Sequence, residues 1–598
     1  MGKLCGWITH DQPAADVLAV VRGMLPGCSE SDVASRASGV VAARPDVVPA
    51  IATESNGLLI AIGGRVRGTD AAKLADLYKR LGERCLEHVS GSFSLAILDP
   101  QTGSGLLAVD RMGTRGLCYA SHPRGLVFGS TAEAVAAHPG VGRQVSRQAL
   151  FNYLYCHMVP SPGTIFREVR KLQPGECVVF RNGAAQPRFY WTMRYTDQAA
   201  ESIDVLESRF RRLLRESAAR AIGGDTEIGA FLSGGTDSST VAGLLTETRG
   251  RPARTYSIGF KAEGFDEMEY ARITARHFRT EAHEYYVTPQ DVVDTIPNVA
   301  QAYDEPFGNA SAVPTYLCAR MARADGVKVM LAGDGGDEIF GGNARYALQR
   351  VFQGYWALPT GLRRRVIEPI MLRADSPNAI APWRKLKSYV RQAAVPLPDR
   401  LETYNFLHRA PLSDIFEGDF LQQLNPEEPL QLQRAAYARA AARSYVDRMM
   451  HLDLKFTLAD NDLRKVSRMC ELAGIEVRYP LIDDALVAFS GELPPDLKVK
   501  GLTLRYFFKR ALRDFLPPET IAKKKHGFGL PFGVWLREHP SLKAMVHDNL
   551  SAFGLRGILR PAYIGHLLRQ HESTHATYYG VMIWIVMMLE QWLAAREL

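Results

Sequence analysis

Residues 231–239, with the sequence FLSGGTDSS, connect a predicted strand to a predicted helix that begins near Ser238. The two adjacent glycines let backbone amides approach a phosphate closely, and the helix N-terminus adds about half a positive charge. The hydroxyls of Ser233, Ser238 and Ser239 supply further donors. The Gly-Lys-Ser/Thr ending of a Walker A loop is missing. The stretch therefore predicts a phosphate-binding turn of another kind, placed after a buried strand.

The pattern on either side of this turn predicts the sheet that carries it. Before it, residues 204–220 have apolar positions at helical spacing. After it, strands are expected at TYSIGF (255–260) and VKVMLAG (327–333), with a helix at 267–277 between them. Such alternation of strands and helices favours a parallel, doubly wound sheet. From about residue 345 onward the chain is expected to be mainly helical.

The first third of the chain has a different pattern. Short strands punctuated by glycine are expected at LLIAIGG (58–64), SFSLAILD (92–99), LLAVDR (106–111) and ECVVFRNG (176–183). Short strands at this spacing predict a layered, β-rich domain with a few helices. Residues 192–204 carry no periodic apolar pattern, which indicates a linker. We therefore expect one domain over residues 1–195 and a second over residues 204–598.

The composition excludes several classes of protein. A chain of 598 residues, 46% hydrophobic and 23% charged, is long enough for a large core and is neither disordered nor collagen-like. Eight cysteines without paired spacing do not indicate a disulfide framework or a zinc site. The net charge of +8, without a basic tail, gives no sign of a nucleic-acid partner.

The two ends of the chain give no sign of a membrane segment. The start, MGKLCGWITHDQ, lacks the basic-then-apolar pattern of a signal peptide, and the apolar run at 580–589 is about half a membrane span. We expect that run to form a buried helix. We also expect a cytoplasmic protein without a membrane partner, and leave open whether it forms a homodimer.

A second acidic turn follows the strand at 327–333. Residues 331–342 have the sequence LAGDGGDEIFGG, and turns of this kind lie at the carboxyl ends of strands, where ligands bind. Its three carboxylates, on Asp334, Asp337 and Glu338, require a nearby cation or raised pKa values. In the first turn, Asp237 beside a phosphate predicts a Mg²⁺ ligand, because Mg²⁺ favours one or two carboxylates together with phosphate oxygens.

These turns resemble those of a known superfamily. SGGTDS (233–238) is similar to the SGGxDS loop of the ATP-pyrophosphatases, which cleave ATP between its α and β phosphates. AGDGGDEIFGG (332–342) resembles the SGxGxDExFGGY motif of the class B asparagine synthetase superfamily, with Asn343 in place of the usual tyrosine. Further similar stretches are DEPF (304–307), SAVPTYLCARMAR (311–323), KVSRM (465–469), EVRYPLID (476–483) and KHGFGLP (525–531).

The resemblance implies a fold and a set of ligand contacts. The fold is an α+β Ntn-hydrolase-like sandwich of the class II glutaminase type, followed by an α/β ATP-pyrophosphatase domain, like the adenine nucleotide α-hydrolases, with a mostly helical C-terminal region. Asp237 and Asp337 would hold Mg²⁺. The residues implied to bind ATP are Ser233, Gly234, Gly235, Asp237, Ser238, Ser239, Ser257, Gly259 and Gly333, with Ser257 to Gly259 on the adenine side.

Three residues have implied catalytic roles. Lys525 matches the lysine that neutralises charge on the phosphates and the tetrahedral intermediate, although the run of lysines at 523–525 leaves a solvated basic face as the alternative. Asp334 occupies the position that is Glu in asparagine synthetases and Tyr in β-lactam synthetase. Asp462 roughly matches the acidic partner in the latter, so the two would deprotonate an attacking amine. Ordinary helix surface is the alternative for Asp462.

The family's glutaminase residues are largely missing. Relatives use an N-terminal cysteine whose own α-amine is the base, whereas four residues precede Cys5 here. The Arg-Leu-Ser-Ile segment that binds the glutamine carboxylate is missing. The oxyanion Asn is Gly63 in GGRVRG (63–68), and losing such a donor costs on the order of 10²–10³ in rate. Asp70 is left to contact the glutamine amine. We expect a retained domain with an inactive glutaminase, with removal of the first four residues to free Cys5 as the alternative.

Three functions remain open on the sequence. The first is ATP-dependent amide formation through an acyl-adenylate, as in an amidotransferase that uses glutamine or ammonia. The second is a ligase or cyclase that uses an amine of its own substrate, like β-lactam synthetases and lasso-peptide macrolactam cyclases. The third is a non-catalytic relative that binds ATP. In the first two the acyl substrate is a small-molecule or peptide carboxylate that the sequence does not identify.

Overall fold

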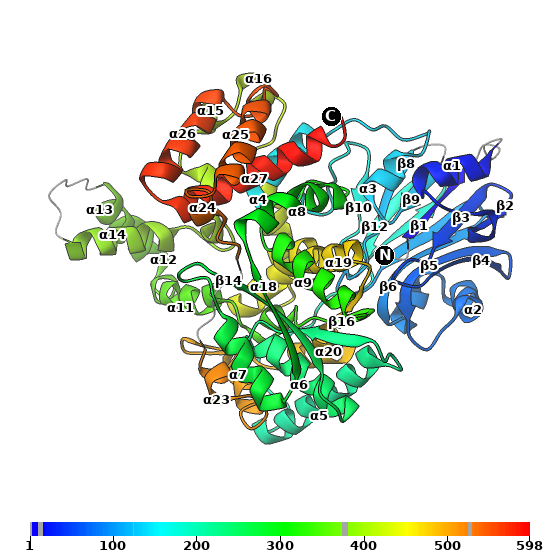
Figure 1. The fold of residues 1–598 in the computed structure, drawn as a ribbon, viewed down its shortest axis with the longest axis horizontal. Helices are drawn as coiled ribbons and strands as arrows, with labels where there is room; N and C mark the ends of the chain where they lie inside the picture. The colour runs from blue at the N-terminus through cyan, green and yellow to red at the C-terminus, as the bar shows by residue number, and fades with distance from the viewer. Residues whose placement is uncertain (1–2, 10–15, 123–124, 374–380, 524–528) are drawn as a thin grey trace.

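The structure is a computed structural model that describes residues 3–9, 16–122, 125–373, 381–523 and 529–598 (Figure 1). The strands of its N-terminal part are β1 (Lys3–Thr9), β2 (Val33–Arg36), β3 (Gly39–Arg44), β4 (Ala50–Ser55), β5 (Leu58–Val66), β6 (Gly91–Asp99), β7 (Ser104–Val109), β8 (Cys118–His122), β9 (Gly125–Gly129), β10 (Arg170–Lys171), β11 (Glu176–Arg181) and β12 (Ala184–Phe189). Its helices are α1 (Val17–Met24), η1 (Glu30–Asp32), α2 (Ala71–Leu81), η2 (Gly82–His88), α3 (Ala132–Ala136) and α4 (Arg147–Cys156).

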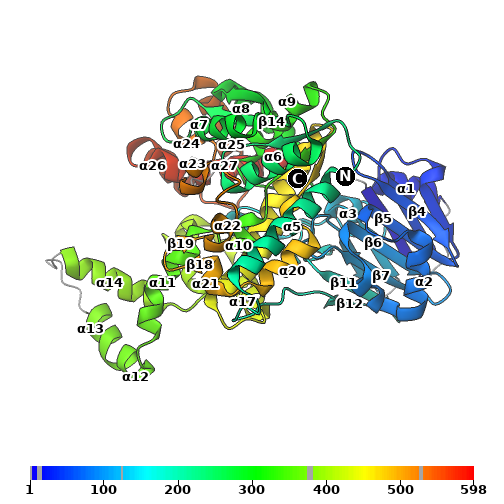
Figure 2. The same cartoon turned by 90° about the horizontal axis from the view of Figure 1, so that it is seen from below.

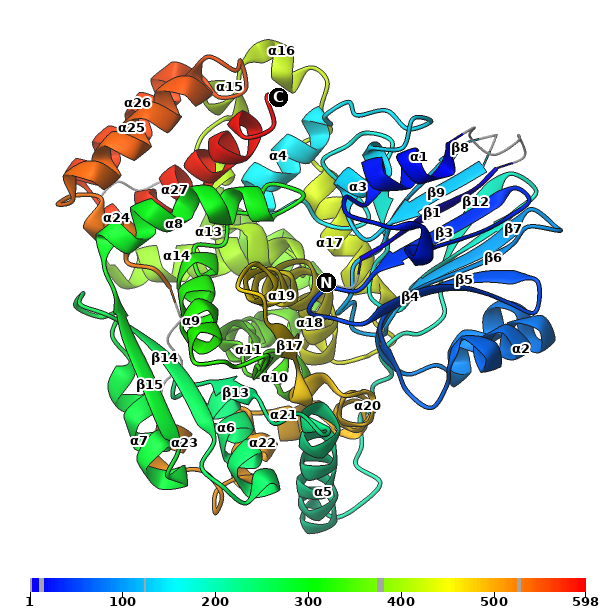
Figure 3. The ribbon, with the colours of Figure 1, turned by 45° about the vertical axis from the view of Figure 1, so that its right-hand side comes forward.

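These strands form two antiparallel six-stranded sheets that pack face to face. Their orders are β10-β8-β9-β1-β3-β2 and β12-β11-β7-β6-β5-β4. Alternation along β1 shows how the sequence builds the layers: Leu4 and Ile8 pack between the sheets, whereas Cys5 and Trp7 point to the opposite face, against α1 and α3. On the far side, α2 covers the outer face of the second sheet (Figure 3). The predicted β-rich, layered domain is confirmed.

The second part begins with α5 (Ile203–Ile222) and carries the parallel sheet. Its further elements are β13 (Ile228–Phe231), α6 (Thr236–Arg249), β14 (Arg254–Phe260), α7 (Met268–Phe278), β15 (Glu281–Val287), α8 (Pro289–Ala302), α9 (Ala312–Ala324), β16 (Val329–Leu331), α10 (Gly336–Phe340) and β17 (Glu476–Arg478). All pairings in the order β15-β14-β13-β16-β17 are parallel, as the alternating pattern predicts. The chain runs from β13 outward through β14 and β15, then returns to pair β16 on the other side. The gap between β13 and β16 is therefore the topological switch point, the usual ligand position in such sheets.

The remaining residues are mainly helical, as expected. The helices are α11 (Ala344–Trp356), α12 (Thr360–Leu362), η3 (Arg363–Ile367), α13 (Glu368–Arg373), α14 (Ala381–Ala394), η4 (Asp399–Glu402), η5 (Phe406–His408), α15 (Leu412–Ile415), α16 (Gly418–Leu421), α17 (Glu428–Arg439), α18 (Tyr445–Asp453), η6 (Leu454–Asp462), α19 (Leu463–Leu472), η7 (Pro480–Ile482), α20 (Asp484–Glu492), α21 (Pro495–Lys498), α22 (Tyr506–Ala511), α23 (Pro518–Ala522), α24 (Phe532–Trp535), α25 (Pro540–Gly554), α26 (Pro561–Ser573) and α27 (Ala576–Ala594). Two short strands, β18 (Val499–Lys500) and β19 (Thr503–Leu504), pair with each other.

Two features of this region position the site and the core. The helices α18 and α19 are joined through the π-helical segment η6, so residues 445–472 form one continuous helix beside the parallel sheet. The apolar run at 580–589 lies in α27, which is buried, as predicted. Within the described residues, no helix combines the length and apolar character that a membrane crossing requires.

Candidate active site

The predicted phosphate turn and the acidic turn lie against each other at the switch point. The first follows β13 and the second follows β16, and these two strands are paired in the sheet. Glycine permits the close approach: a Cβ on Gly333 would lie 2.8 Å from the backbone nitrogen of Ser238, and one on Gly336 would lie 2.4 Å from Oδ1 of Asp237. The glycines of the acidic turn therefore keep its backbone in contact with the phosphate turn.

The phosphate turn leaves a helix N-terminus without a side-chain cap. Gly235 is the N-cap of the 14-residue helix α6, and within the described residues this cap makes no side-chain hydrogen bond to the first amides of the helix. The turn is closed from within, because Oγ of Ser238 accepts from the nitrogen of Ser233 at 3.2 Å and lies 3.0 Å from Oγ of Ser233. Uncapped amides at a helix start form an anion site. The arrangement is the one that a phosphate group requires.

The other residues predicted to bind ATP lie at different depths. The hydroxyl of Ser239 is fully buried and lies 2.9 Å from that of Thr274 on α7, so it does not face the open side of the turn. Ser257 lies in the middle of β14 and donates to the carbonyl of Leu232, the residue after β13, at 2.7 Å. Gly259 follows it, two residues further along the strand. Ser257 and Gly259 therefore lie beside the phosphate turn at the edge where a bound nucleotide would extend.

A single guanidinium joins the two predicted metal ligands. Arg505 donates to both carboxylate oxygens of Asp237, each at 2.5 Å, and also to Asp337. Burial alone would lower the pKa of Arg505, but the two carboxylates raise it above its usual value. The three side chains are 6%, 19% and 18% exposed, respectively, so their charges interact with little screening by solvent. Two carboxylates from separate turns thus converge on one point.

The paired carboxylates fit a magnesium ion that also binds phosphate. Mg²⁺ takes oxygen ligands and commonly uses one or two carboxylates, with phosphate and water completing the set. No cluster of three or more His, Cys, Asp or Glu side chains suited to a metal occurs among the residues that the structure describes. Asp237 and Asp337 would therefore hold the ion only together with phosphate oxygens. Arg505 and the ion would compete for the same carboxylates.

Arg505 was not predicted from the sequence. It is the residue before α22 and has a left-handed backbone, with φ of 54°. That conformation is uncommon outside glycine and marks positions held in place by their surroundings. Arg505 lies outside both glycine-rich turns, so neither motif indicates it. An arginine directly before a predicted helix was the available signal, and it is a weak one.

The predicted base and its partner come together around a lysine. Lys465 pairs with Asp462 at 2.8 Å. Burial raises the pKa of Asp334 to about 7; Lys465 opposes this rise, and the negative charges of Asp462 and Asp237 add to it. The residues that hold this cluster come from the acidic turn and from the continuous helix 445–472. Lys465 is the cation between Asp334 and Asp462. The sequence indicated it only as part of the motif KVSRM (465–469).

The predicted lysine Lys525 lies outside the described residues. Its neighbour Lys523 is described, and its ammonium donates to the carbonyl of Ser233 at 3.4 Å. The same ammonium pairs with Glu267 at 3.2 Å and is 7% exposed. Burial lowers the pKa of Lys523 below its usual value. The lysine run therefore brings at least one buried positive charge to the phosphate turn.

Cys5 lies in the middle of β1, between β3 and β9. Its side chain is fully buried, and burial raises the pKa of its thiol far above the usual range. A neutral, buried thiol is a poor nucleophile, because the thiolate is the reactive form. As described, Cys5 is a buried core residue on the face of the first sheet that packs against α1 and α3.

Residues 63–68, where the sequence predicts a lost oxyanion donor, form ion pairs with the second domain. Arg65 pairs with Glu476 at the start of β17, at 3.1 Å. Arg67 pairs with both Asp483 and Asp484 at the start of α20. Burial would raise the pKa of Glu476, but hydrogen bonds from Arg478 and from Arg65 lower it to about 2. The two arginines therefore fasten the β-sandwich to the parallel sheet.

Together these features define a class: a two-domain protein with a β-sandwich joined to an α/β domain whose switch point carries a phosphate turn and paired carboxylates. The asparagine synthase family profile matches residues 209–594, and the glutamine amidotransferase domain profile matches residues 62–191. The chain belongs to the asparagine synthase family.

Individual proteins are similar over most of the chain. Asparagine synthetase [glutamine-hydrolyzing] 1 of Bacillus subtilis is 24% identical over 88% of this chain and 80% of its own length. A putative asparagine synthetase [glutamine-hydrolyzing] of Mycobacterium tuberculosis is 28% identical over 79% of this chain and 72% of its own. Amidase chry2 of Gibberella zeae is 22% identical over 79% and 74%. Among solved structures, glutamine phosphoribosylpyrophosphate amidotransferase from B. subtilis aligns over 55% of this chain and 80% of its own, at 14% identity and a TM-score of 0.21.

Replacing Arg505 by alanine tests its place between the two carboxylates. Removing the cation from a buried pair typically costs about 3–5 kcal/mol, so R505A is expected to lower the thermal unfolding midpoint in metal-free buffer. Added Mg²⁺ should then raise the midpoint of R505A more than that of the unchanged protein, because the carboxylates are released to the ion. Differential scanning fluorimetry with and without Mg²⁺ measures both effects.

Arg510 provides the matched control for this measurement. It lies on the adjoining helix α22, pairs with Glu207 and is 40% exposed, so R510A should lower the thermal midpoint less than R505A does and leave the Mg²⁺ response unchanged. Equal midpoints and equal Mg²⁺ responses for R505A and the unchanged protein would show that Arg505 is not the counter-ion of these carboxylates.

Proposed function

We propose that this chain forms an amide bond through an acyl-adenylate. A carboxylate oxygen of the substrate attacks the α-phosphorus of ATP, and pyrophosphate leaves with the electrons of the broken P–O bond. An amine nitrogen then attacks the acyl carbon, and AMP leaves. The observation that carries the proposal is the convergence of Asp237, Asp337 and Arg505 beside the uncapped start of α6.

The protein's own groups have distinct tasks in the first half-reaction. The amides at the start of α6 bind the phosphates and orient them against the acyl oxygen. Arg505 and Lys523 place positive charge on either side of the turn, where negative charge develops as pyrophosphate departs. A Mg²⁺ ion held by Asp237 and Asp337 would supply further neutralisation of phosphate charge.

Asp334 is proposed as the base of the second half-reaction. An amine must lose a proton as it attacks the acyl carbon, and a base works best when its pKa is close to the working pH. Burial raises the pKa of Asp334 to about 7, which meets that condition. Lys465, paired with Asp462, lies close enough to counter part of this shift and so keeps Asp334 partly ionised. Lys465 and Asp462 therefore act as positioning residues.

We propose that the nitrogen comes from an amine of a substrate. It would not come from glutamine hydrolysed in the β-sandwich domain. Two observations support this choice. Cys5 is fully buried within β1, and its thiol has a raised pKa. A glutamine pocket would need an oxyanion donor from the segment at 63–68. Instead, Arg65 and Arg67 of this segment form ion pairs with the second domain. A ligase or cyclase therefore fits better than an amidotransferase.

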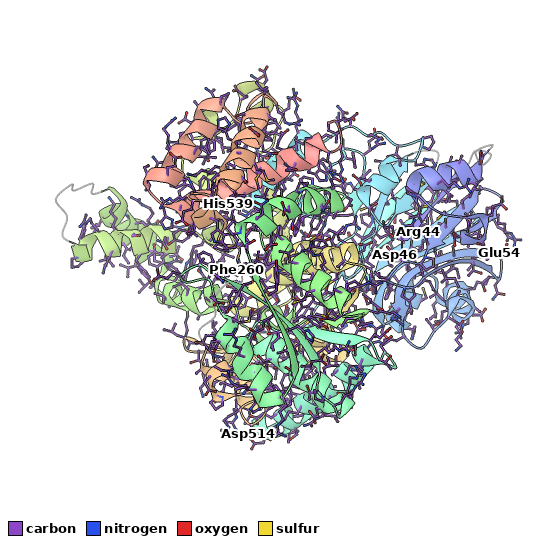
Figure 4. All side chains as sticks on the ribbon, viewed as in Figure 1. Arg44, Asp46, Glu54, Phe260, Asp514 and His539 are labelled. Atoms are coloured by element: carbon purple, nitrogen blue, oxygen red, sulfur yellow. The ribbon has the colours of Figure 1, made fainter. Side chains whose placement is uncertain are left out.

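Exchange of labelled pyrophosphate into ATP tests the first half-reaction without requiring the amine. With a panel of small-molecule and peptide carboxylates, at least one is expected to support exchange. D237A and D337A should each reduce that exchange on the order of 10²-fold, because a charged group at the phosphates is lost. D514A is the matched control, since Asp514 is exposed at the edge of the domain, far from the turns (Figure 4). Full exchange in both D237A and D337A would refute the proposed site. If the protein binds ATP but no carboxylate of the panel supports exchange, a non-catalytic relative would be favoured.

The nitrogen source is tested with the carboxylate that supports exchange. Amide product is expected when the substrate carries an amine, and C5A should form it at the unchanged rate within about twofold, since a neutral, buried thiol is not a reactive nucleophile. Glutamine labelled with ¹⁵N in its amide should leave no label in the product. A working glutaminase would be established if the unchanged protein forms labelled product and C5A does not, while C5A still reacts with ammonia.

The pH dependence of amide formation tests Asp334. The rate should rise with pH around 7 as this carboxyl loses its proton, and D334N should lack that rise and lose at least tenfold at pH 8. Because the folded-state pKa of Asp334 is raised above the unfolded value, its ionisation penalises the folded state increasingly as the pH rises from about 4 to 7. D334N should therefore raise the thermal midpoint at pH 8 while lowering activity. If D334N is slower but keeps the pH profile of the unchanged protein, Asp334 is not the base.

A further inference from the structure

The helices that follow the acidic turn form a strongly basic projection. We call residues 344–373 and 381–394 the basic arm; they comprise α11, α12, η3, α13 and α14. In these residues there are ten of the chain's 72 Arg and Lys but only one of its 64 Asp and Glu, Glu368. The positive charge of a chain with a net charge of +8 is therefore concentrated in this one element.

The basic arm is also where exposed apolar side chains gather. Eight of the 19 large hydrophobic side chains that are exposed in the described residues lie between positions 348 and 386. Leu362, Val366 and Ile370, which are 42%, 45% and 56% exposed, follow one another at four-residue spacing through α12, η3 and α13. This spacing places them in one stripe along a continuous helix. The exposed Arg364 and Arg365 lie beside the stripe.

The arm does not need this stripe for its own stability. The arm has a small core of its own, built from Phe352, Tyr355, Met371, Val390 and Ala393. Arg363, on the inward side of the same helix, stacks on Trp356 at 4.3 Å and donates to the carbonyl of Leu358. The inward face is thus occupied, and the stripe is a second, outward apolar face. A contiguous exposed apolar face of this kind marks a binding surface.

Five exposed cations of the arm lack a counter-ion among the described residues, whereas the exposed Arg350 pairs with Asp496 at 3.8 Å. Arg364, Arg365, Arg384, Lys385 and Arg391 are exposed, and none has an ion-pair partner within the part of the chain that the structure describes. Elsewhere many arginines are paired, including Arg65 and Arg505. Unpaired charges of one sign beside an apolar stripe require a partner that is both negatively charged and apolar.

Shape and charge together favour one partner. Figure 2 shows α12, α13 and α14 extending away from the body of the molecule, so the stripe, which runs through α12, η3 and α13, belongs to a projecting part of the chain. A second copy of the chain would present the same positive charge and be repelled. Its remaining residues, with 62 basic and 63 acidic side chains, offer no excess of negative charge. A flat, anionic and apolar surface meets every condition.

We propose that the basic arm binds the surface of an anionic lipid bilayer. Leu362, Val366 and Ile370 enter the boundary between headgroups and acyl chains, and Arg364 and Arg365 contact the lipid phosphates. The expectation of no membrane partner rested on the lack of a spanning segment, which does not exclude a helix lying in the interface. The proposal is independent of the proposed chemistry, which takes place at the switch point of the sheet.

Co-sedimentation of the full chain with lipid vesicles tests this assignment. Binding is expected to vesicles of equal parts phosphatidylglycerol and phosphatidylcholine, and not to phosphatidylcholine alone. L362S/V366S/I370S and R364E/R365E should each weaken that binding about tenfold or more, since each removes apolar burial or phosphate contacts. Pyrophosphate exchange without vesicles and the thermal midpoint should stay unchanged, which shows that these surface variants fold.

Matched variants elsewhere control for charge and for apolar exposure. K79E/R80E makes the same charge change on α2, and L502S/L555S/V581S removes three apolar side chains that are 69%, 90% and 47% exposed. Both should bind vesicles as the unchanged protein does. No binding to the anionic vesicles, or equal weakening by the arm and control variants, would overturn the proposal. So would saturable binding of soluble polyglutamate without vesicle binding, which would assign the arm to an acidic polypeptide.

Discussion

The repulsion between two carboxylates is the constraint on which the rest of this structure depends. Asp237 and Asp337 belong to turns that are 100 residues apart in the chain, yet they share one guanidinium. The parallel order of the sheet brings the turns together, the glycines allow contact between them, and Arg505 offsets the resulting negative charge. Without a cation, the low-dielectric surroundings would make this arrangement costly. The fold thus holds in place a group of charges that is stable only with a positive partner.

The β-sandwich contributes to the same arrangement from the other side. Arg65 pairs with Glu476 on β17, the edge strand beside β16 in the parallel sheet, and Arg67 pairs with residues at the start of α20. Glu476 keeps a pKa of about 2, so its interactions with Arg478 and Arg65 weaken only when the pH falls below about 4. Residues 63–68 thus supply ion pairs that hold the β-sandwich against the second domain.

Much of the fold was predictable because its signals are local. Strand alternation, glycine turns and helical spacing occur within a few residues of each other, and they predicted the two layered sheets, the parallel sheet and the helical region. The site was predictable where motifs coincide with strand ends, as for Asp237 and Asp334. Arg505 was missed because its role arises from packing against turns more than 160 residues earlier in the chain. The orientation of Ser239 toward Thr274 was also missed, since one helical turn contains both inward and outward hydroxyls.

The charges around Asp334 suggest how one site separates two half-reactions. Asp334 already has a pKa of about 7 through burial and through its neighbours Asp462 and Asp237, with Lys465 opposing them. A bound triphosphate adds several negative charges at the adjoining turn, and these would raise that pKa further and keep the carboxyl protonated. On the proposed function, departure of pyrophosphate removes most of that charge, so the pKa of Asp334 falls. The carboxylate would then be available as a base only once the adenylate has formed. On the proposed function, electrostatic coupling between the two turns would therefore favour this order of the steps.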